Sequence, residues 1–154
     1  MKKKMHINGI AHIALNVINI RESFAFYSKI MPQLGLTLIH NSKKSFYYVG
    51  GKTGILIQQA NINSKSKNFK FSQDNLGLHH FCFRMRSIED IQEFYYFLKD
   101  IKANIIRGPM NGNWVKGYYY LVFEDPDGIR LEVNYVPDKG IFEENAKFNP
   151  SGNY

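Results

Sequence analysis

The segment Gly9-Ile10-Ala11-His12-Ile13-Ala14 recurs as Gly77-Leu78-His79-His80-Phe81-Cys82, so a histidine stands at the same place in both copies, 68 residues apart. The similarity continues downstream, where Phe26 corresponds to Phe94 at the same offset. A repeat this long is typical of duplicated modules and is longer than a solenoid unit. The sequence therefore predicts two related halves and a site that uses a histidine from each.

Each half predicts the same order of elements, βαβββ. An alternating apolar strand opens each copy, and a helix follows it with an N-cap residue, Asn19 or Ser87. Three strands complete each half, at 36–39, 46–49 and 54–60 and at 103–106, 118–123 and 129–135. We therefore expect an α+β fold with one domain over residues 1–136, built from modules at about 7–62 and 75–136. A polar linker covers 61–73, and a C-terminal extension covers 137–154.

Composition restricts the compartment and the partners. The single cysteine, Cys82, rules out an intrachain disulfide, and no stretch has the roughly 18 apolar residues of a membrane span. Residues 1–73 hold eleven Lys or Arg and one acid, whereas residues 74–154 hold nine against twelve. This charge asymmetry can attract an anionic small molecule. Nucleic-acid binding is not indicated, because the sequence has no basic stripe along a helix with interleaved aromatic residues. We expect a cytoplasmic protein that binds neither nucleic acid nor a membrane.

The last strand of the second half carries the most informative polar residue. Its apolar residues alternate, which leaves Glu132 on the opposite face, where a buried carboxylate needs a cation, a metal or water. The pair Gly54-Ile55 and Gly128-Ile129 gives an offset of 74, by which Glu132 corresponds to Gln58. The duplication therefore selects four positions: His12, Gln58, His80 and Glu132.

Two imidazoles, a carboxylate and an amide oxygen can hold a divalent metal and leave a position open for water or substrate. The ion could be Zn, Ni, Mn, Co or Fe, and the sequence predicts no organic cofactor. Taken singly, His12 and Gln58 are better explained as ordinary strand residues, and Glu132 could simply pair with Arg130 or Arg84. By the same parity, His79 is expected on the opposite face, Cys82 as a small packing residue, and the tyrosines at 118–120 as sheet aromatics.

From Gly9 to about Val136 the chain resembles the vicinal oxygen chelate superfamily, which includes glyoxalase I, methylmalonyl-CoA epimerases, extradiol dioxygenases, fosfomycin resistance enzymes and bleomycin-binding proteins. The resemblance rests on the strands around His12 and His80 and on the sequence Glu124-Asp125-Pro126-Asp127-Gly128-Ile129-Arg130-Leu131-Glu132-Val133. It implies a cupped mixed sheet, metal ligands at His12, Gln58, His80 and Glu132, and a homodimer. Whether the modules pair within one chain or across a swapped dimer stays open.

Several departures from the family pattern bear on the reaction. Glyoxalase I-like enzymes usually have Glu where this chain has Gln58, and the epimerases use a further acid that is missing between Ser23 and Gln73. Extradiol and fosfomycin enzymes typically have a tyrosine where Val122 stands, and fosfomycin enzymes favour threonine in place of Ala14. Bleomycin-binding proteins generally lack the metal ligands that are retained here.

We therefore expect a glyoxalase-like metalloenzyme of the lyase or isomerase type that acts on a small, oxygen-chelating, anionic substrate. Glu132, or water on the metal, would serve as the acid or base. A binding protein of the bleomycin-resistance kind and an extradiol dioxygenase are the alternatives.

Overall fold

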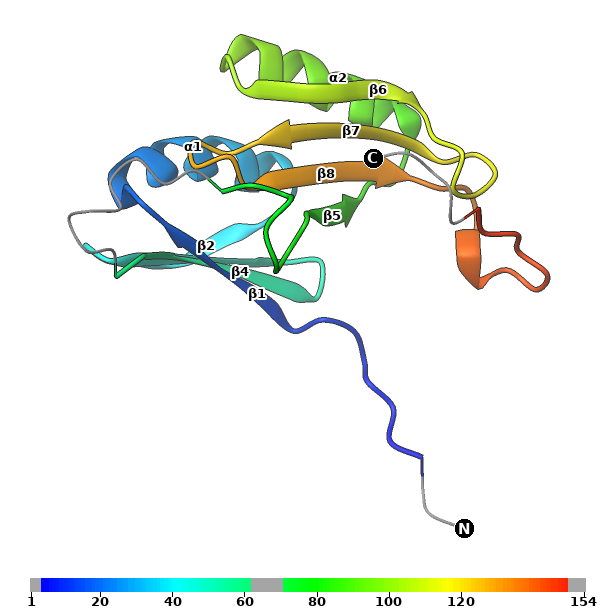
Figure 1. Ribbon diagram of the computed structural model, residues 1–154, viewed down its shortest axis with the longest axis horizontal. Coiled ribbons are helices and arrows are strands. Elements are labelled where there is room, and N and C mark those ends of the chain that lie inside the picture. Colours follow the sequence, from blue (N-terminus) through cyan, green and yellow to red (C-terminus); the bar gives the residue numbers. More distant parts are fainter. Residues whose placement is uncertain (1–3, 62–70, 150–154) are drawn as a thin grey trace. The chain divides into compact units, whose positions relative to one another are not determined.

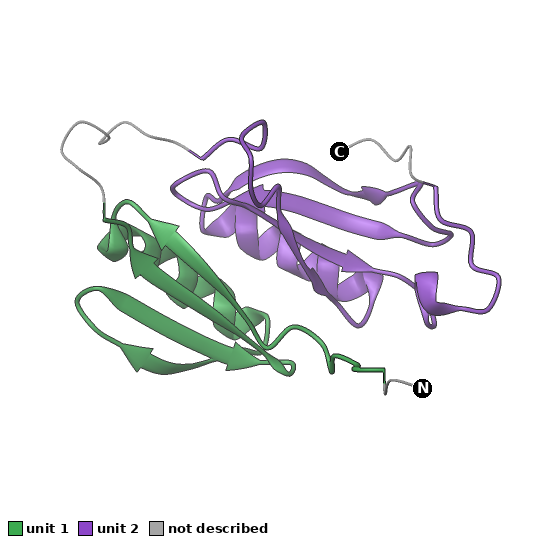
Figure 2. Ribbon diagram, turned by 60° about the horizontal axis from the view of Figure 1, so that its bottom comes forward, with its two compact units in different colours: residues 1–69 green, residues 70–154 purple. Residues whose placement is uncertain are grey.

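The computed structural model describes residues 4–61 and 71–149, which form two compact units, Met1–Phe69 and Lys70–Tyr154 (Figures 1 and 2). Most of the predicted linker at 61–73 lies outside the described residues. No helix within the two described ranges is long and apolar enough to cross a membrane.

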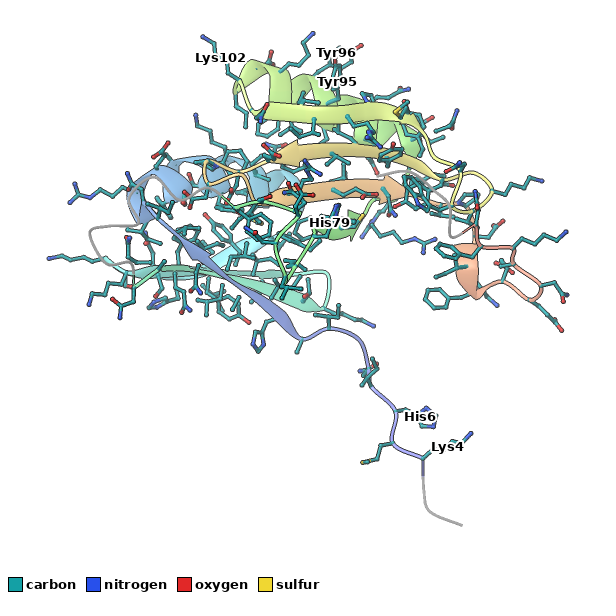
Figure 3. The ribbon with its side chains drawn as sticks, viewed as in Figure 1. Lys4, His6, His79, Tyr95, Tyr96 and Lys102 are labelled. Atoms are coloured by element: carbon teal, nitrogen blue, oxygen red, sulfur yellow. The ribbon has the colours of Figure 1, made fainter. Side chains whose placement is uncertain are left out.

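The first unit is a four-stranded mixed sheet with one helix. Its elements are β1 (His12–Val17), α1 (Ile20–Gln33), β2 (Thr37–Asn41), β3 (Ser45–Gly50) and β4 (Thr53–Gln59). The strand order is β1-β4-β3-β2, in which β1 runs parallel to β4 and the other neighbours are antiparallel. The N-terminal segment with Lys4 and His6 extends away from the sheet of this unit (Figure 3).

The second unit repeats this arrangement. It contains β5 (Phe81–Arg84), α2 (Ile88–Asp100), β6 (Asn104–Asn111), β7 (Tyr119–Glu124), β8 (Arg130–Tyr135) and a short 3-10 turn, Gly140–Phe142. The strand order is β5-β8-β7-β6, again with one parallel pair, β5 and β8. Two four-stranded mixed sheets with one helix each confirm the predicted α+β fold and the order βαβββ in both halves.

Both helices begin where the sequence predicts and pack on one face of their sheet. The side chain of Asn19 accepts the backbone N–H of Arg21, and that of Ser87 accepts the backbone N–H of Asp90. In the first unit the ring of Phe24 lies 5.1 Å from that of Phe46, and in the second unit Phe94 lies 5.7 Å from Phe123. Phe46 of β3 and Phe123 of β7 therefore face the helices, and the residues next to them along each strand point to the opposite face of the sheet.

The C-terminal extension contacts the second unit. Arg84 donates from Nη2 to the carbonyl of Asp138 over 3.4 Å, and the backbone N–H of Asn149 donates to the carbonyl of Trp114 over 2.7 Å. The tail is therefore tied to this unit at both ends of its described part.

A buried turn sets the start of β8. Asp125 is 5% exposed, and its Oδ1 accepts the backbone N–H groups of Asp127 at 2.9 Å and of Ile129 at 2.8 Å. A residue at position 128 must adopt a φ of 84°, which favours the glycine found there. This turn fixes where β8 begins, and therefore where its polar residues lie relative to β5.

Replacing Asp125 should destabilise the protein, because two backbone donors would lose their acceptor. We expect Asp125→Ala to lower the free energy of unfolding by about 2 kcal/mol, measured by urea denaturation. Asp125→Asn keeps an oxygen at Oδ1 and should cost less. Asp100→Ala, at the exposed end of α2, is the control and should change stability by less than about 0.5 kcal/mol. Equal effects of Asp125→Ala and Asp100→Ala would contradict this account of the turn.

Candidate metal centre

The parallel pair β5 and β8 brings His80 to Glu132. Phe81 pairs with Leu131 and Cys82 with Glu132, so His80 stands at the level of Arg130. The glutamate is 1% exposed, and its Oε2 lies 3.2 Å from Nε2 of His80, which is 17% exposed. Two of the four predicted positions therefore lie side by side on the face opposite α2.

Tyr118, expected from the sequence to be a sheet aromatic, contacts the same carboxylate. It lies immediately before β7, and its hydroxyl donates to Oε1 of Glu132 over 2.5 Å. Desolvation of the phenol and its bond to Glu132 raise the pKa of Tyr118 above its usual range. The phenol therefore stays protonated at neutral pH and acts as a donor.

The other carboxylate oxygen is suited to a metal. Among the described residues, Oε2 of Glu132 is buried and has no hydrogen-bond partner, although Nε2 of His80 is close to it. Two ligand atoms about 2.1 Å from a shared ion lie roughly 2.9 to 3.4 Å apart, for octahedral and tetrahedral angles respectively. The observed separation of 3.2 Å falls in that range, so these two residues fit a divalent ion.

His79 does not face away from the site as its parity predicted. Its Nδ1 lies 2.7 Å from Nδ1 of His80, and both histidines line one pocket (Figure 3 labels His79). Desolvation, followed by the charges of His80 and Arg130, lowers the pKa of His79. A tautomer in which His80 Nδ1–H donates to His79 leaves Nε2 of His80 with a lone pair that faces Glu132. The parity rule failed because His79 and His80 precede β5 and do not belong to the regular strand.

The pocket combines positive charge with apolar walls. It lies within the second unit and is lined by His79, His80, Ile106, Arg107, Tyr120, Val122, Arg130 and Glu132. Arg130 of β8 pairs with Glu124 of β7 at 3.4 Å, and Arg107 comes from β6, on the other side of β7. Two guanidinium groups beside a buried carboxylate can attract an anionic ligand towards the His80 and Glu132 pair.

Cys82 is adjacent to Glu132. The residue is exposed on β5, and its sulfur lies beside the carboxylate. Desolvation and the charge of Glu132 raise the pKa of the Cys82 thiol well above its usual value.

In the first unit, His12 opens β1 and is exposed, and it pairs with Gly54 of β4. Gln58 lies four residues further along β4, roughly 13 Å from that point at about 3.3 Å per residue. Its amide donates to the side chain of Asn16 over 2.9 Å. The first unit therefore separates His12 from Gln58 along the sheet.

The strand registers give a different correspondence between the halves from the sequence offset. In the second unit, Glu132 lies two residues beyond Arg130, which is level with His80. In the first unit, the residue two beyond Gly54, which is level with His12, is Leu56. Leu56 is thus the positional counterpart of Glu132, and Gln58 is that of Asn134.

Within the described parts of the chain, no group of three or more His, Cys, Asp or Glu side chains is close enough to hold a metal. His80 and Glu132 would supply two protein ligands from the second unit if a metal binds there. A catalytic metal site commonly has three protein ligands, so such a site would need a further one.

The fold and the site define a class of protein, one built from two βαβββ units in which a histidine lies beside a buried glutamate in the second unit. Residues 9–133 match the family model of the Glyoxalase/Bleomycin resistance protein/Dioxygenase superfamily. The chain belongs to this superfamily, which confirms the resemblance found in the sequence.

Similar proteins include metallothiol transferases and a fosfomycin resistance protein. The metallothiol transferase FosB of Staphylococcus haemolyticus is 30% identical over 129 residues, which cover 83% of this chain and 84% of that protein. A crystal structure from Bacillus halodurans, provisionally assigned as a glyoxalase, is 26% identical, has a TM-score of 0.73 and covers 84% of this chain and 96% of that one. The fosfomycin resistance protein FosX of Listeria monocytogenes shares the fold, with a TM-score of 0.63. It is 20% identical, and the match covers 85% of this chain and 95% of that one.

The raised pKa of Tyr118 predicts a loss of stability at alkaline pH. In the folded protein the phenol stays neutral where an unfolded tyrosine, with a pKa of about 10, ionises. The stabilisation is therefore complete below pH of about 10 and is lost as the pH rises above it. We expect the unfolding free energy of the wild type to fall more steeply above pH 10 than that of Tyr118→Phe, by up to about 1.4 kcal/mol per pH unit.

Urea denaturation between pH 8 and pH 11.5 measures this difference. Tyr119→Phe is the matched control, because it removes a hydroxyl from the next residue and should keep the wild-type slope. Parallel slopes for the wild type and Tyr118→Phe would show that the phenol of Tyr118 has an ordinary pKa.

Proposed function

We propose that this protein is a metal-dependent enzyme that acts on a small, anionic, oxygen-chelating substrate. One observation carries the proposal: Oε2 of Glu132 is buried without a hydrogen bond and lies 3.2 Å from Nε2 of His80. Burying a carboxylate without a compensating charge costs several kcal/mol. A divalent cation shared with His80 would supply that positive charge. Relatives that are metallothiol transferases support metal dependence in general.

We propose His12 as the third ligand, because it is the repeat counterpart of His80. It would come from the first unit, either of the same chain or of a second copy in a homodimer. Gln58 is the weakest member of the expected set, since its amide is bonded to Asn16 and its strand position matches Asn134. The set His12, His80 and Glu132 leaves coordination positions open for substrate oxygens. We also propose the cytoplasm as the compartment, because a chain with a single cysteine agrees with a reducing environment.

Different residues of the second unit would bind the substrate and transfer the proton. A bound metal would polarise a substrate oxygen and lower the pKa of a proton on the substrate or on bound water. Arg107 and Arg130 would hold the anionic group, while Ile106 and Val122 exclude water from that wall of the pocket. Glu132 would accept or return a proton only through Oε2 and only when that oxygen is released from the metal, since Oε1 is occupied by Tyr118. Otherwise water on the metal would serve as the acid or base.

Proton transfer of the lyase or isomerase type is the reaction that we favour. A second candidate is addition of a small thiol to an electrophile, which the name of the metallothiol transferase relatives suggests. In that reaction the thiol gives up its proton, sulfur bonds to a carbon of an epoxide, the carbon–oxygen bond breaks and the released oxygen takes up the proton. Against fosfomycin itself as the electrophile stand Val122 and Ala14, which replace the tyrosine and threonine typical of fosfomycin enzymes.

The wild type should bind one divalent ion per chain, measured by elemental analysis and by calorimetric titration with Zn, Ni, Mn, Co and Fe(II). We expect His12→Ala, His80→Ala and Glu132→Gln each to weaken binding by at least 100-fold, because each removes a ligand. Gln58→Leu should weaken it by less than tenfold. His40→Ala, an exposed histidine on β2, is the control and should bind like the wild type.

The same loaded protein should be assayed with hemithioacetals, with epoxides plus small thiols, and with catechols under oxygen. Turnover of hemithioacetals supports proton transfer, thiol consumption supports the second candidate, and oxygen uptake would indicate an extradiol dioxygenase. A wild type that takes up no stoichiometric metal and is unaffected by Glu132→Gln would overturn the enzyme proposal and favour a binding protein.

The two pocket arginines predict a charge-specific effect on substrate binding. We expect Arg107→Ala to raise KM for an anionic substrate by about tenfold or more, with kcat little changed, because a charge-assisted contact to a non-reacting group is lost. The same variant should leave KM for an uncharged analogue unchanged. Arg86→Ala, exposed and outside the pocket, is the control, and an equal rise in KM for it would refute a specific role for Arg107.

A further inference from the structure

We propose that Tyr118 is a positioning residue that makes Glu132 bind the metal through Oε2 alone. This inference rests on the proposed metal site, but it concerns a residue for which no role was expected from the sequence. Tyr118 would touch neither the metal nor the substrate. It would act through the carboxylate that it holds.

The contacts of Glu132 divide its two oxygens between two tasks. Oε1 accepts the hydroxyl of Tyr118 at 2.5 Å, whereas Oε2 has no hydrogen bond among the described residues and faces Nε2 of His80. The carboxylate is almost fully buried, so water cannot replace either contact freely. A hydroxyl at this place selects one orientation of the carboxylate and reserves Oε2 for a cation.

The loop before β7 fixes the tyrosine. The carbonyl of Tyr118 accepts the backbone N–H of Gly112 at 2.8 Å, and its ring lies 5.0 Å from that of Trp114. A Cβ at Gly112 would lie 2.4 Å from the Trp114 ring and 2.9 Å from the Tyr118 ring, so only glycine permits this packing. The carbonyl of Trp114 in turn accepts the N–H of Asn149 in the C-terminal extension.

This support matters because a carboxylate ligand has two competing binding modes. With Oε1 occupied, Glu132 offers a single oxygen and leaves more coordination positions for substrate. Without the phenol, Oε1 would lack a donor and could also bind the metal, which would change the coordination number. Hydrogen bonds to metal ligands typically alter metal affinity by about 10- to 100-fold when they are removed.

The test is the metal affinity of Tyr118→Phe, measured by competition with a chromophoric chelator. We expect the dissociation constant to rise by about 10- to 100-fold relative to the wild type. Tyr119→Phe is the matched control, because the neighbouring tyrosine starts β7 and makes no hydrogen bond to Glu132 within the described residues. Equal affinity of the wild type, Tyr118→Phe and Tyr119→Phe would overturn the proposal.

A spectroscopic measurement separates positioning from a general structural role. X-ray absorption of the Co(II)-loaded proteins should show one more oxygen ligand in Tyr118→Phe than in the wild type and in Tyr119→Phe. A variant that merely loosened the fold would bind less metal but keep the wild-type coordination number. That result would also contradict the proposal.

The outcomes also distinguish failure of this inference from failure of the proposed function. A wild type that binds no divalent ion refutes both, whereas a wild type that binds metal together with an unaffected Tyr118→Phe refutes the positioning role alone. If Tyr118→Phe does not fold, fluorinated Tyr118 in the otherwise unchanged chain replaces it. Its fluorine NMR signal should shift on metal loading more than that of fluorinated Tyr119, and no such difference would count against the proposal.

Discussion

The buried carboxylate of Glu132 is the constraint on which the arrangement of the second unit depends. It is 1% exposed in the middle of a sheet, where an uncompensated negative charge would cost several kcal/mol. Tyr118 satisfies one oxygen, and His80 lies beside the other without making a hydrogen bond to it. The turn at Asp125 sets the start of β8, and the loop from Gly112 to Tyr118 places the phenol. A cation at Oε2 would complete this set of contacts.

The fold was predictable because the sequence pattern of a βαβββ module occurs in both halves of the chain. The repeated strand, the N-caps at Asn19 and Ser87 and the alternating residues of the strands depend on local patterns, which the duplication makes visible. The pairing of His80 with Glu132 followed from the same alternation. Tyr118 did not, because it lies in a loop whose path depends on long-range packing against Trp114 and on the tail at Asn149. The correspondence of Gln58 with Glu132 relied on a count between turns of different length, whereas the strand register matches Glu132 with Leu56.

The two halves have therefore diverged in chemistry while keeping their topology. Each provides a histidine at the start of its first strand, but only the second has a carboxylate two residues beyond the level of that histidine. The pocket residues Arg107 and Arg130 also belong to the second half, although the excess of positive charge lies in residues 1–73. An asymmetric site of this kind suits a substrate whose anionic group and chelating oxygens are bound by different residues. Membership of the superfamily sets the fold, and these residues must set the reaction.

The central claim is that a divalent metal binds between His80 and Glu132. Anomalous diffraction from crystals grown with Co(II) or Zn(II), collected on both sides of the metal absorption edge, tests it most directly. The account predicts one strong anomalous peak about 2.0 to 2.2 Å from Nε2 of His80 and from Oε2 of Glu132, with the hydroxyl of Tyr118 still bonded to Oε1. An imidazole of His12, from the same chain or from a second copy, should complete the protein ligands. A metal-soaked crystal with no anomalous peak at these atoms, and with His80 bonded directly to Glu132, would contradict the account.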